Sequence, residues 1–230
     1  LNRNRIIAMM AAILLREHPG TTIVTDSITS TGLAAFIKKH GGVHHRFKRG
    51  YRNVINESMR LNREGHDSQL AMETSGHGAL KENYFLDDGA YLVTRLLIEL
   101  ARAKKEGYTL ESLIADLAEP AESKEFRMNI LVPDFKAYGQ KIIDELNVYA
   151  ASQPGWSVAP DNFEGVRVNL DKAHGDGWFL LRLSLHDPLI PLNIESDSVG
   201  GVRQIAAELA PFLRPFDQLD TSALLAFAGC

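Results

Sequence analysis

The sequence of residues 70–78 is Leu70-Ala71-Met72-Glu73-Thr74-Ser75-Gly76-His77-Gly78. Its apolar start leads directly into a polar turn with two glycines, which is typical of a buried strand followed by a loop. Two similar β-branched or apolar runs predict further strands at Thr22–Thr25 and His44–Phe47. Apolar residues at helical spacing predict helices between these strands, at Leu33–Ile37 and Tyr51–Leu61. Strands that alternate with helices indicate an α/β fold, here a three-layer domain with a mainly parallel sheet.

Two more helices are expected in this first part of the chain. One covers Ile6–Leu15 and ends at His18-Pro19-Gly20, because proline cannot continue a helix and glycine accepts the left-handed cap. The other is long and begins after Asp87-Asp88, either of which can cap it. Leucines at helical spacing predict its buried stripe, which comprises Leu92, Leu96, Leu97 and Leu100.

The pattern changes near Glu119–Lys124, where Pro120 and its charged neighbours are typical of an exposed linker. Beyond it, alternating apolar residues predict strands at Phe126–Val132, Gly165–Leu170, Gly177–Leu183 and Leu189–Ile194. Helices are expected at Phe135–Tyr149 and at about Val199–Phe212. Strands joined by short turns and flanked by helices indicate a smaller α+β domain with an antiparallel sheet. The sequence therefore predicts two domains, residues 1–119 and 120–230.

Composition excludes several classes of protein. The net charge of -4 at pH 7 and the isoelectric point of about 6.1 argue against a general binder of nucleic acid or of anionic membranes. The only cysteine is Cys230, so no disulfide can form within the chain, and we expect a reducing, cytoplasmic location. The apolar run Ile6–Leu15 is too short to span a bilayer and has no signal cleavage site. Because the sequence begins at Leu1 rather than at methionine, we expect a fragment of a longer protein.

The loop after Met72 is the first candidate site. The carboxylate of Glu73 can accept hydrogen bonds from vicinal sugar hydroxyls, and Ser75 can donate or accept one more. His77 can change charge near neutral pH and can contact a phosphate or a hydroxyl. A polar turn without a ligand fits the same residues.

A second candidate site follows the predicted strand Gly177–Leu183. The planar fork of Arg182 suits bidentate phosphate binding, while Ser184 and His186 add donors on the same loop. Asp187-Pro188 favours a turn that would hold these donors in place. A β-hairpin loop with a surface arginine is the alternative.

A basic turn, Arg46-Phe47-Lys48-Arg49-Gly50-Tyr51-Arg52, is a third candidate, because a helix that starts next to four cations favours an anion. A solvated basic turn fits it equally well. The nearby His40, His44 and His45 have no carboxylate or cysteine at ligand spacing, so no metal site is expected there. Two acidic clusters, Asp87-Asp88 and Asp171–Asp176, fit a helix cap and a turn. The sequence has no phosphate-loop, dinucleotide-binding or nucleophile-elbow pattern.

Together these segments resemble the α-D-phosphohexomutase family, which includes phosphoglucomutase and phosphomannomutase. The third domain of that family carries a sugar-recognition loop of the form Gly-Glu-x-Ser-Gly-His, which Glu73–His77 matches with Met72 in place of the first glycine. The downstream Asn83–Gly89 resembles the family's continuation into a long helix, and Gly50-Tyr51-Arg52 resembles its upstream loop. The resemblance extends from about Asn2 to Phe212.

The fourth domain of the family carries a phosphate loop of the form Arg-x-Ser-x-Thr-Glu-Pro. Arg182, Ser184 and Pro188 match it, His186 replaces the threonine and Asp187 replaces the glutamate. The residue between serine and threonine, usually small, is Leu185. The resemblance therefore implies that residues 1–119 are the sugar-recognition domain and residues 120–230 the phosphate-binding domain.

The resemblance implies an enzyme that interconverts hexose 1-phosphates and hexose 6-phosphates through a phosphoserine, with Mg²⁺ held by an Asp-rich loop. Neither the serine loop nor the metal loop of the family occurs in this sequence, so both are expected in a missing N-terminal half, and this fragment alone is expected to be inactive. It would bind the hydroxyls of the sugar through Glu73, Ser75 and His77, and the non-reacting phosphate through Arg182, Ser184 and His186. Tyr51 and Arg52 are a possible additional anion contact.

The expected partners are glucose 1-phosphate, mannose 1-phosphate and the bisphosphate intermediate, together with the missing N-terminal domains. No nucleic acid or membrane is expected among them. A non-catalytic sugar-phosphate-binding module with the same fold is the alternative.

Overall fold

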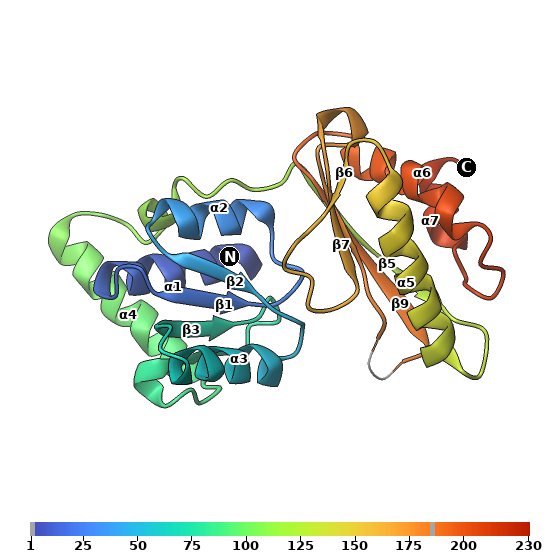
Figure 1. Cartoon of the computed structure of the whole chain (residues 1–230). Helices are drawn as coiled ribbons and strands as arrows, with labels where there is room; N and C mark the ends of the chain where they lie inside the picture. Colours follow the sequence, from blue (N-terminus) through green and yellow to red (C-terminus); the bar gives the residue numbers. More distant parts are fainter. Residues whose placement is uncertain (1–2, 185–186) are drawn as a thin grey trace. The chain divides into compact units, whose positions relative to one another are not determined.

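The chain divides into two compact units, Leu1–Glu119 and Pro120–Cys230. The computed structural model describes residues 3–184 and 187–230 (Figure 1). The first unit contains, in chain order, α1 (Arg3–Glu17), β1 (Thr22–Thr25), α2 (Thr31–Lys39), β2 (Val43–Arg46), α3 (Tyr51–Arg63), β3 (Ser68–Met72), β4 (Gly78–Leu80), the 3₁₀ turn η1 (Lys81–Asn83), α4 (Gly89–Glu106) and the 3₁₀ turn η2 (Glu111–Ile114).

The sheet of the first unit has the strand order β2-β1-β3-β4. The first three strands are parallel, and β4 runs antiparallel to β3. The prediction of an α/β domain with a mainly parallel sheet is thus confirmed, although β4 was not predicted. In the register, Thr25 at the end of β1 faces both Arg46 and Met72. All three parallel strands therefore end at the same level, and the loops that follow them meet at one edge of the sheet.

Helices cover both faces of this sheet. Ile23, Leu70 and Met72 pack on one face with α1, α2 and α4, whereas Val24 and Ala71 pack on the other face with α3. Successive side chains of a β-strand point to opposite faces of the sheet, which explains this alternation. The most buried helix is α1, in which every residue from Ile7 to Leu15 is buried. The core of this unit therefore lies mainly between the sheet and α1.

The predicted buried stripe of α4 is partly wrong. Leu92 is buried and Leu96 is partly buried against the core, but Leu97 and Leu100 are 58% and 49% exposed. Glu99 is buried instead, because it accepts a hydrogen bond from Tyr108 Oη at 2.5 Å and forms an ion pair with Arg16. The contacts of Glu99 to Arg16 on α1 and to Tyr108 after α4 therefore decide which side of α4 faces the core. The spacing of the leucines alone does not decide it.

The second unit is an antiparallel sheet packed against helices. Its elements are β5 (Glu122–Asn129), α5 (Phe135–Ser152), β6 (Trp156–Val158), β7 (Val166–Leu170), the 3₁₀ turn η3 (Lys172–His174), β8 (Gly177–Leu181), β9 (Leu189–Ser196), α6 (Gly201–Leu213) and α7 (Ser222–Ala228). The strand order is β5-β9-β8-β7-β6, and all neighbours are antiparallel. This confirms the predicted fold class, while the short β6 and α7 were not predicted.

One core holds the second unit together. Alternate residues of the central strands, among them Val168, Phe179 and Leu192, pack against α5, α6 and α7. Across the residues that the structure describes in both units, no helix is long and apolar enough to cross a membrane.

The buried carboxylate of Glu99 offers a test of how α4 is held. We expect Glu99→Ala to lower the free energy of unfolding by about 2 kcal/mol, because it removes hydrogen bonds to a buried charged acceptor. Solvent around the partly exposed Arg16 weakens its ion pair with Glu99 and limits the loss. Urea denaturation followed by circular dichroism measures this change. As a control, Glu106→Ala replaces an exposed glutamate at the end of the same helix and should cost less than about 0.5 kcal/mol. Equal effects of the two substitutions would contradict the role assigned to Glu99.

Candidate functional site

Three loops meet at the carboxyl edge of the sheet in the first unit. They follow β1, β2 and β3, and they comprise residues 26–30, 47–50 and 73–77. In sheets of this kind the loops at this edge build the binding site. The predicted sugar-recognition loop and the predicted basic turn both lie here.

Glu73 directly follows β3 and is buried. Its Oε1 accepts a hydrogen bond from the backbone N–H of Gly50 at 2.9 Å, and its Oε2 accepts one from Ser75 Oγ at 2.7 Å. Arg49 Nε lies 3.7 Å from Oε1. A carboxylate has about four acceptor positions, so Glu73 retains capacity for a ligand hydroxyl while it connects the two loops.

The loop between Glu73 and Gly78 is a tight turn. The N–H of Glu73 donates to the carbonyl of His77 at 2.8 Å, and the N–H of Gly76 donates to the carbonyl of Glu73 at 3.0 Å. Gly76 has a φ of +101°, which favours glycine because a side chain would be strained there. Ser75, Gly76 and His77 are exposed at the tip. The turn therefore presents its polar atoms to solvent on a fixed backbone.

His77 is held by two neighbours that lie far from each other in the sequence. Its Nδ1 lies 2.7 Å from Asp87 Oδ2, and its ring stacks on Tyr51 with 4.9 Å between ring centroids. Because an ionised carboxylate only accepts hydrogen bonds, Nδ1 carries the proton in this pair, and Nε2 lies on the side of the ring away from Asp87. Asp87 therefore orients His77, whereas Asp88 caps α4 by accepting from the N–H of Tyr91 at 3.0 Å.

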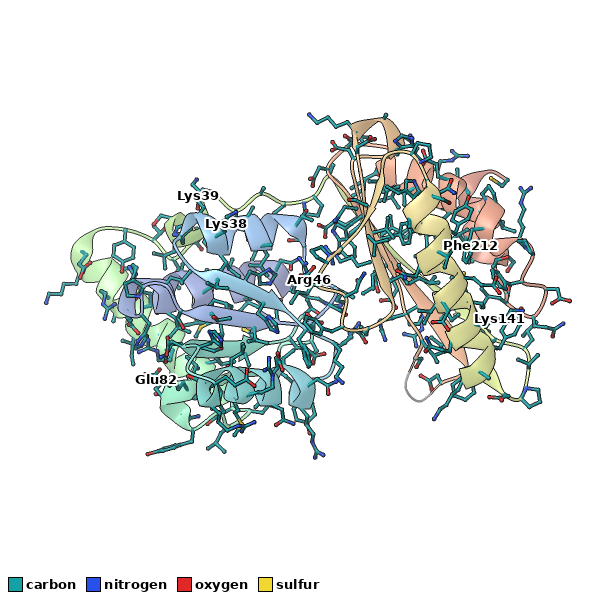
Figure 2. The ribbon with its side chains drawn as sticks, viewed as in Figure 1. Lys38, Lys39, Arg46, Glu82, Lys141 and Phe212 are labelled. Atoms are coloured by element: carbon teal, nitrogen blue, oxygen red, sulfur yellow. The ribbon has the colours of Figure 1, made fainter. Side chains whose placement is uncertain are left out.

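The basic turn is only partly one site. Arg52 lies beside Tyr51, with its Nε 3.0 Å from the Tyr51 hydroxyl, so Tyr51 and Arg52 join the cluster around His77. Arg46, by contrast, is buried at the end of β2, where its Nε donates to Thr29 Oγ1 at 3.4 Å (Figure 2). Gly50 starts α3 with a φ of +117°, and this conformation points its N–H at Glu73.

Asp26 is a buried acid that the sequence pattern alone did not assign to the site. It directly follows β1 and has no exposed surface. Its Oδ1 accepts a hydrogen bond from the N–H of Thr74 at 3.2 Å, and its Oδ2 accepts one from Thr74 Oγ1 at 2.6 Å. Asp26 thus fastens the loop after β3 to the loop after β1, one residue away from Glu73.

Burial raises the pKa of Asp26 to about 6, because a charged carboxylate loses its hydration there. The hydrogen bonds from Thr74 and the charge of Arg49 oppose this rise, while the charge of Glu73 adds to it. Asp26 therefore changes its charge within the range in which many enzymes work.

The three histidines near the basic turn have separate partners. His40 pairs with Asp116, His44 Nε2 lies 2.7 Å from Thr25 Oγ1, and His45 Nε2 lies 2.8 Å from Glu57 Oε1. In residues 3–184 and 187–230, no group of three His, Cys, Asp or Glu side chains could hold a metal ion. The carboxylates of Asp26, Glu73 and Asp87 are engaged by protein donors. The described residues therefore do not fit the magnesium site that the resemblance implies for the longer protein.

The second candidate site lies in the other unit, between β8 and β9. The N–H of Arg182 donates to the carbonyl of Pro191 at 3.2 Å, which continues the sheet past the end of β8. Leu183 packs against the core, so Arg182 and Ser184 lie on the opposite side of the extended chain. At Gly165, a Cβ atom would lie 2.1 Å from the carbonyl oxygen of Leu181, so only glycine lets that turn pack against the start of the loop.

Ser184 shapes the turn of this loop. Its N–H donates to the carbonyl of Leu189 at 3.0 Å, and its Oγ accepts from the N–H of Asp187 at 3.2 Å. The hydroxyl proton of Ser184 remains available to donate to an anion. His186, the third predicted phosphate contact, lies outside the described residues, as does Leu185.

Sequence reasoning missed Asp26 and the role of Asp87. Asp26 is 48 residues from its partner Thr74, and Asp87 is ten residues from His77. A signal for Asp26 was present, because an acid directly after a parallel strand lies at the edge where such sheets bind ligands.

Comparison with known proteins places the first unit in one family. Residues 2–120 match the family model described as "Phosphoglucomutase/phosphomannomutase, alpha/beta/alpha domain III". The phosphomannomutase/phosphoglucomutase of Pseudomonas putida is 31% identical over 204 residues, which are 88% of this chain and 40% of that protein. The chain thus spans about 40% of the length of these curated relatives.

Solved structures show the same fold. The X-ray structure of a phosphoglucomutase/phosphomannomutase family protein from Burkholderia thailandensis superposes with a TM-score of 0.74 at 26% identity, covering 96% of this chain and 43% of that one. The N-acetylphosphoglucosamine mutase of Aspergillus fumigatus, solved in complex with GlcNAc-6P and magnesium, superposes with a TM-score of 0.58 at 14% identity, covering 93% of this chain and 47% of that one. The latter likeness concerns the fold alone.

The raised pKa of Asp26 predicts a pH dependence of stability. Folding makes Asp26 bind its proton more tightly, so its contribution to stability is full below pH 3.8 and is lost as the pH rises through 6. The free energy of unfolding of the wild type, relative to Asp26→Asn, should therefore fall by about 2 kcal/mol between pH 4 and pH 7. Urea denaturation at several pH values measures this difference. As a control, the difference in the free energy of unfolding between the wild type and Asp217→Asn, which changes an exposed aspartate, should not vary with pH in this way. If the difference between the wild type and Asp26→Asn were also independent of pH, the prediction would be refuted.

Proposed function

The chain belongs to the phosphoglucomutase/phosphomannomutase family, and we propose that it supplies sugar and phosphate recognition to an enzyme that interconverts hexose 1-phosphates and hexose 6-phosphates. In this proposal, the unit Leu1–Glu119 recognises the sugar and the unit Pro120–Cys230 binds the phosphate that is not reacting. Glucose and mannose phosphates are the proposed substrates. The proposed location is the cytoplasm, because a single cysteine leaves this chain no internal disulfide, as is usual in a reducing compartment.

The observation that carries the proposal is the cluster of Glu73, Ser75 and His77 with Tyr51 at the carboxyl edge of the sheet. Glu73 has spare acceptor capacity for a hydroxyl, and Ser75 is exposed beside it. The Nε2 atom of His77 can accept from a hydroxyl, and on protonation it can donate to a phosphate. Arg52, next to Tyr51, adds a positive charge to the same surface.

Such contacts suit a substrate that must bind in two opposite orientations. The proposed reaction begins when a phosphoserine gives its phosphoryl group to the hexose phosphate and forms a bisphosphate. The bisphosphate turns around, and its other phosphoryl group returns to the serine. Glu73 and Ser75 can bind the hydroxyls of the sugar in both orientations if its equatorial hydroxyls occupy the same positions in each.

Arg182 and Ser184 are the proposed clamp for the distal phosphate. A guanidinium binds two phosphate oxygens at once, and the Ser184 hydroxyl donates to a third. Holding the distal phosphate turns its binding energy into orientation at the reacting phosphate. This clamp acts on whichever phosphate is not being transferred.

The phosphoserine and Mg²⁺ belong, in this proposal, to a part of the longer protein outside this chain. When bound there, Mg²⁺ would supply electrostatic stabilisation to the phosphoryl group in transfer. The Aspergillus fumigatus mutase, in complex with GlcNAc-6P and magnesium, is a precedent for a sugar phosphate and magnesium bound within this fold.

Calorimetric titration of the 230-residue chain with glucose 1-phosphate and mannose 1-phosphate tests the two binding sites. We expect saturable binding that weakens about tenfold or more in both Glu73→Ala and Arg182→Ala, since each removes a charged hydrogen-bonding group. Circular dichroism should show that both variants remain folded. Glu111→Ala and Arg127→Ala, which change exposed residues of the same units, should bind as the wild type does. Binding that is indifferent to Glu73→Ala and Arg182→Ala would reject the proposed contacts.

The chain alone should not catalyse the mutase reaction, because the proposed phosphoserine lies outside it. A coupled assay for hexose 6-phosphate formation from hexose 1-phosphate measures this. Turnover by the purified chain would contradict the proposed division of labour. If the longer protein also bound hexose phosphates without turnover, the chain would instead belong to a non-catalytic binding module.

A further inference from the structure

The carboxylate of Asp87 binds two neighbouring residues of the loop after β3. Its Oδ2 lies 2.7 Å from His77 Nδ1, and its Oδ1 accepts a hydrogen bond from the backbone N–H of Gly78 at 3.2 Å. Each carboxylate oxygen thus faces one nitrogen of the loop. The orientation of the imidazole and the pairing of the backbone beside it therefore depend on the same side chain.

The backbone holds Asp87 and Gly78 in fixed positions. Asp87 forms an antiparallel bridge with Ala79. The N–H of Asp88 donates to the carbonyl of Gly78 at 3.3 Å. Gly78 is buried, and a Cβ atom there would lie 2.9 Å from Leu92 Cδ1, so its backbone packs directly against α4. The N–H of Gly78 is consequently a fixed donor, and leaving it unpaired would be costly.

Tyr51 holds the imidazole of His77 from its face. The two rings stack with 25° between their planes. Turning the imidazole by half a turn would place a carbon atom opposite Asp87 and lose the hydrogen bond. Nε2 therefore stays on the side away from Asp87, and within residues 3–184 and 187–230 it has no hydrogen-bond partner. The side chain of His77 is 51% exposed, so a ligand can reach the ring.

We propose that Asp87 is a positioning residue that keeps the proton of neutral His77 on Nδ1, so that Nε2 accepts a hydrogen bond from a hydroxyl of the substrate. An ionised carboxylate only accepts, so it pairs with Nδ1–H and leaves the free lone pair of the imidazole on Nε2. A hydroxyl can donate to this atom, whereas a phosphate without a proton cannot. Neutral His77 therefore selects a hydroxyl of the sugar at this position. The choice of ligand rests on the proposed function.

Asp87→Asn tests the position of the proton, because an amide has one acceptor atom and one donor atom. The buried N–H of Gly78 requires the amide oxygen, so the amide NH₂ group faces His77 Nδ1. Neutral His77 must then carry its proton on Nε2, the effect expected when asparagine replaces an aspartate that orients a histidine. Nitrogen-15 NMR of the labelled 230-residue chain at about pH 8, where an ordinary histidine is neutral, distinguishes the two tautomers.

We expect a protonated Nδ1 in the wild type and a protonated Nε2 in Asp87→Asn. The signal of His77 is identified by its loss in His77→Gln. Asp88→Asn is the matched control, because it removes the same charge from the adjacent residue and asparagine can still cap α4. It should keep the proton on Nδ1, and circular dichroism should show that all variants are folded. A proton on Nε2 in the wild type, or on Nδ1 in Asp87→Asn, would overturn the proposal.

Fluorinated ligands test the direction of the hydrogen bond to the substrate. In a set of glucose 1-phosphate analogues, fluorine replaces one ring hydroxyl at a time, which removes the donor. Calorimetry should find at least one analogue that binds the wild type and Asp88→Asn about tenfold more weakly than glucose 1-phosphate does. For that analogue the loss in Asp87→Asn should be less than about threefold, because Nε2 then carries a proton and presents no lone pair to the fluorine.

The outcomes separate this inference from the proposed function. Equal losses for every analogue in the wild type and in Asp87→Asn would overturn the role of Asp87 in substrate recognition. The proposed function would still stand if Glu73→Ala weakened binding. A wild-type chain that did not bind glucose 1-phosphate would overturn the proposed function, and with it the selection of a sugar hydroxyl, while the NMR spectra would still decide whether Asp87 sets the tautomer of His77.

Discussion

Two buried carboxylates, Asp26 and Glu73, hold together the three loops at the carboxyl edge of the sheet. Asp26 binds the backbone and the hydroxyl of Thr74, and Glu73 binds the backbone of Gly50 and the hydroxyl of Ser75. A buried carboxylate is costly unless donors satisfy it, so these contacts specify the positions of the loops narrowly. The exposed tip of the loop can then present fixed polar atoms to a ligand.

Local patterns in the sequence were sufficient to predict the fold class of both units. The strands at Thr22–Thr25 and Ser68–Met72 contain short apolar or β-branched runs because both of their faces are buried, and the long helices have apolar residues at helical spacing. The candidate loop was also visible locally, since Glu73 and Ser75 follow directly after an apolar strand. Short elements such as β4, β6 and α7 were missed, because three to seven residues carry too little periodicity and depend on tertiary contacts.

The missed contacts are long-range. The bond between Asp26 and Thr74 joins residues 48 positions apart, and the pair of Glu99 and Arg16 joins residues 83 apart. Glu99 stands between two apolar residues and Asp26 directly follows a predicted strand, but the sequence alone does not show which donors would satisfy either carboxylate when it is buried. In α4 this contact shifted the expected buried stripe: Leu92 and Leu96 still pack against the core, but Leu97 and Leu100 are exposed.

The double use of Glu73 also limits how the specificity of this surface can evolve. A mutation at Glu73 removes a proposed hydroxyl contact and at the same time releases the loop from Gly50, so selection for a new sugar at that position would be opposed by lost stability. Ser75 and His77 are exposed and contribute less to the fold, and they can vary more freely. Divergence in substrate choice should therefore concentrate at the tip of the loop, while its two anchors persist.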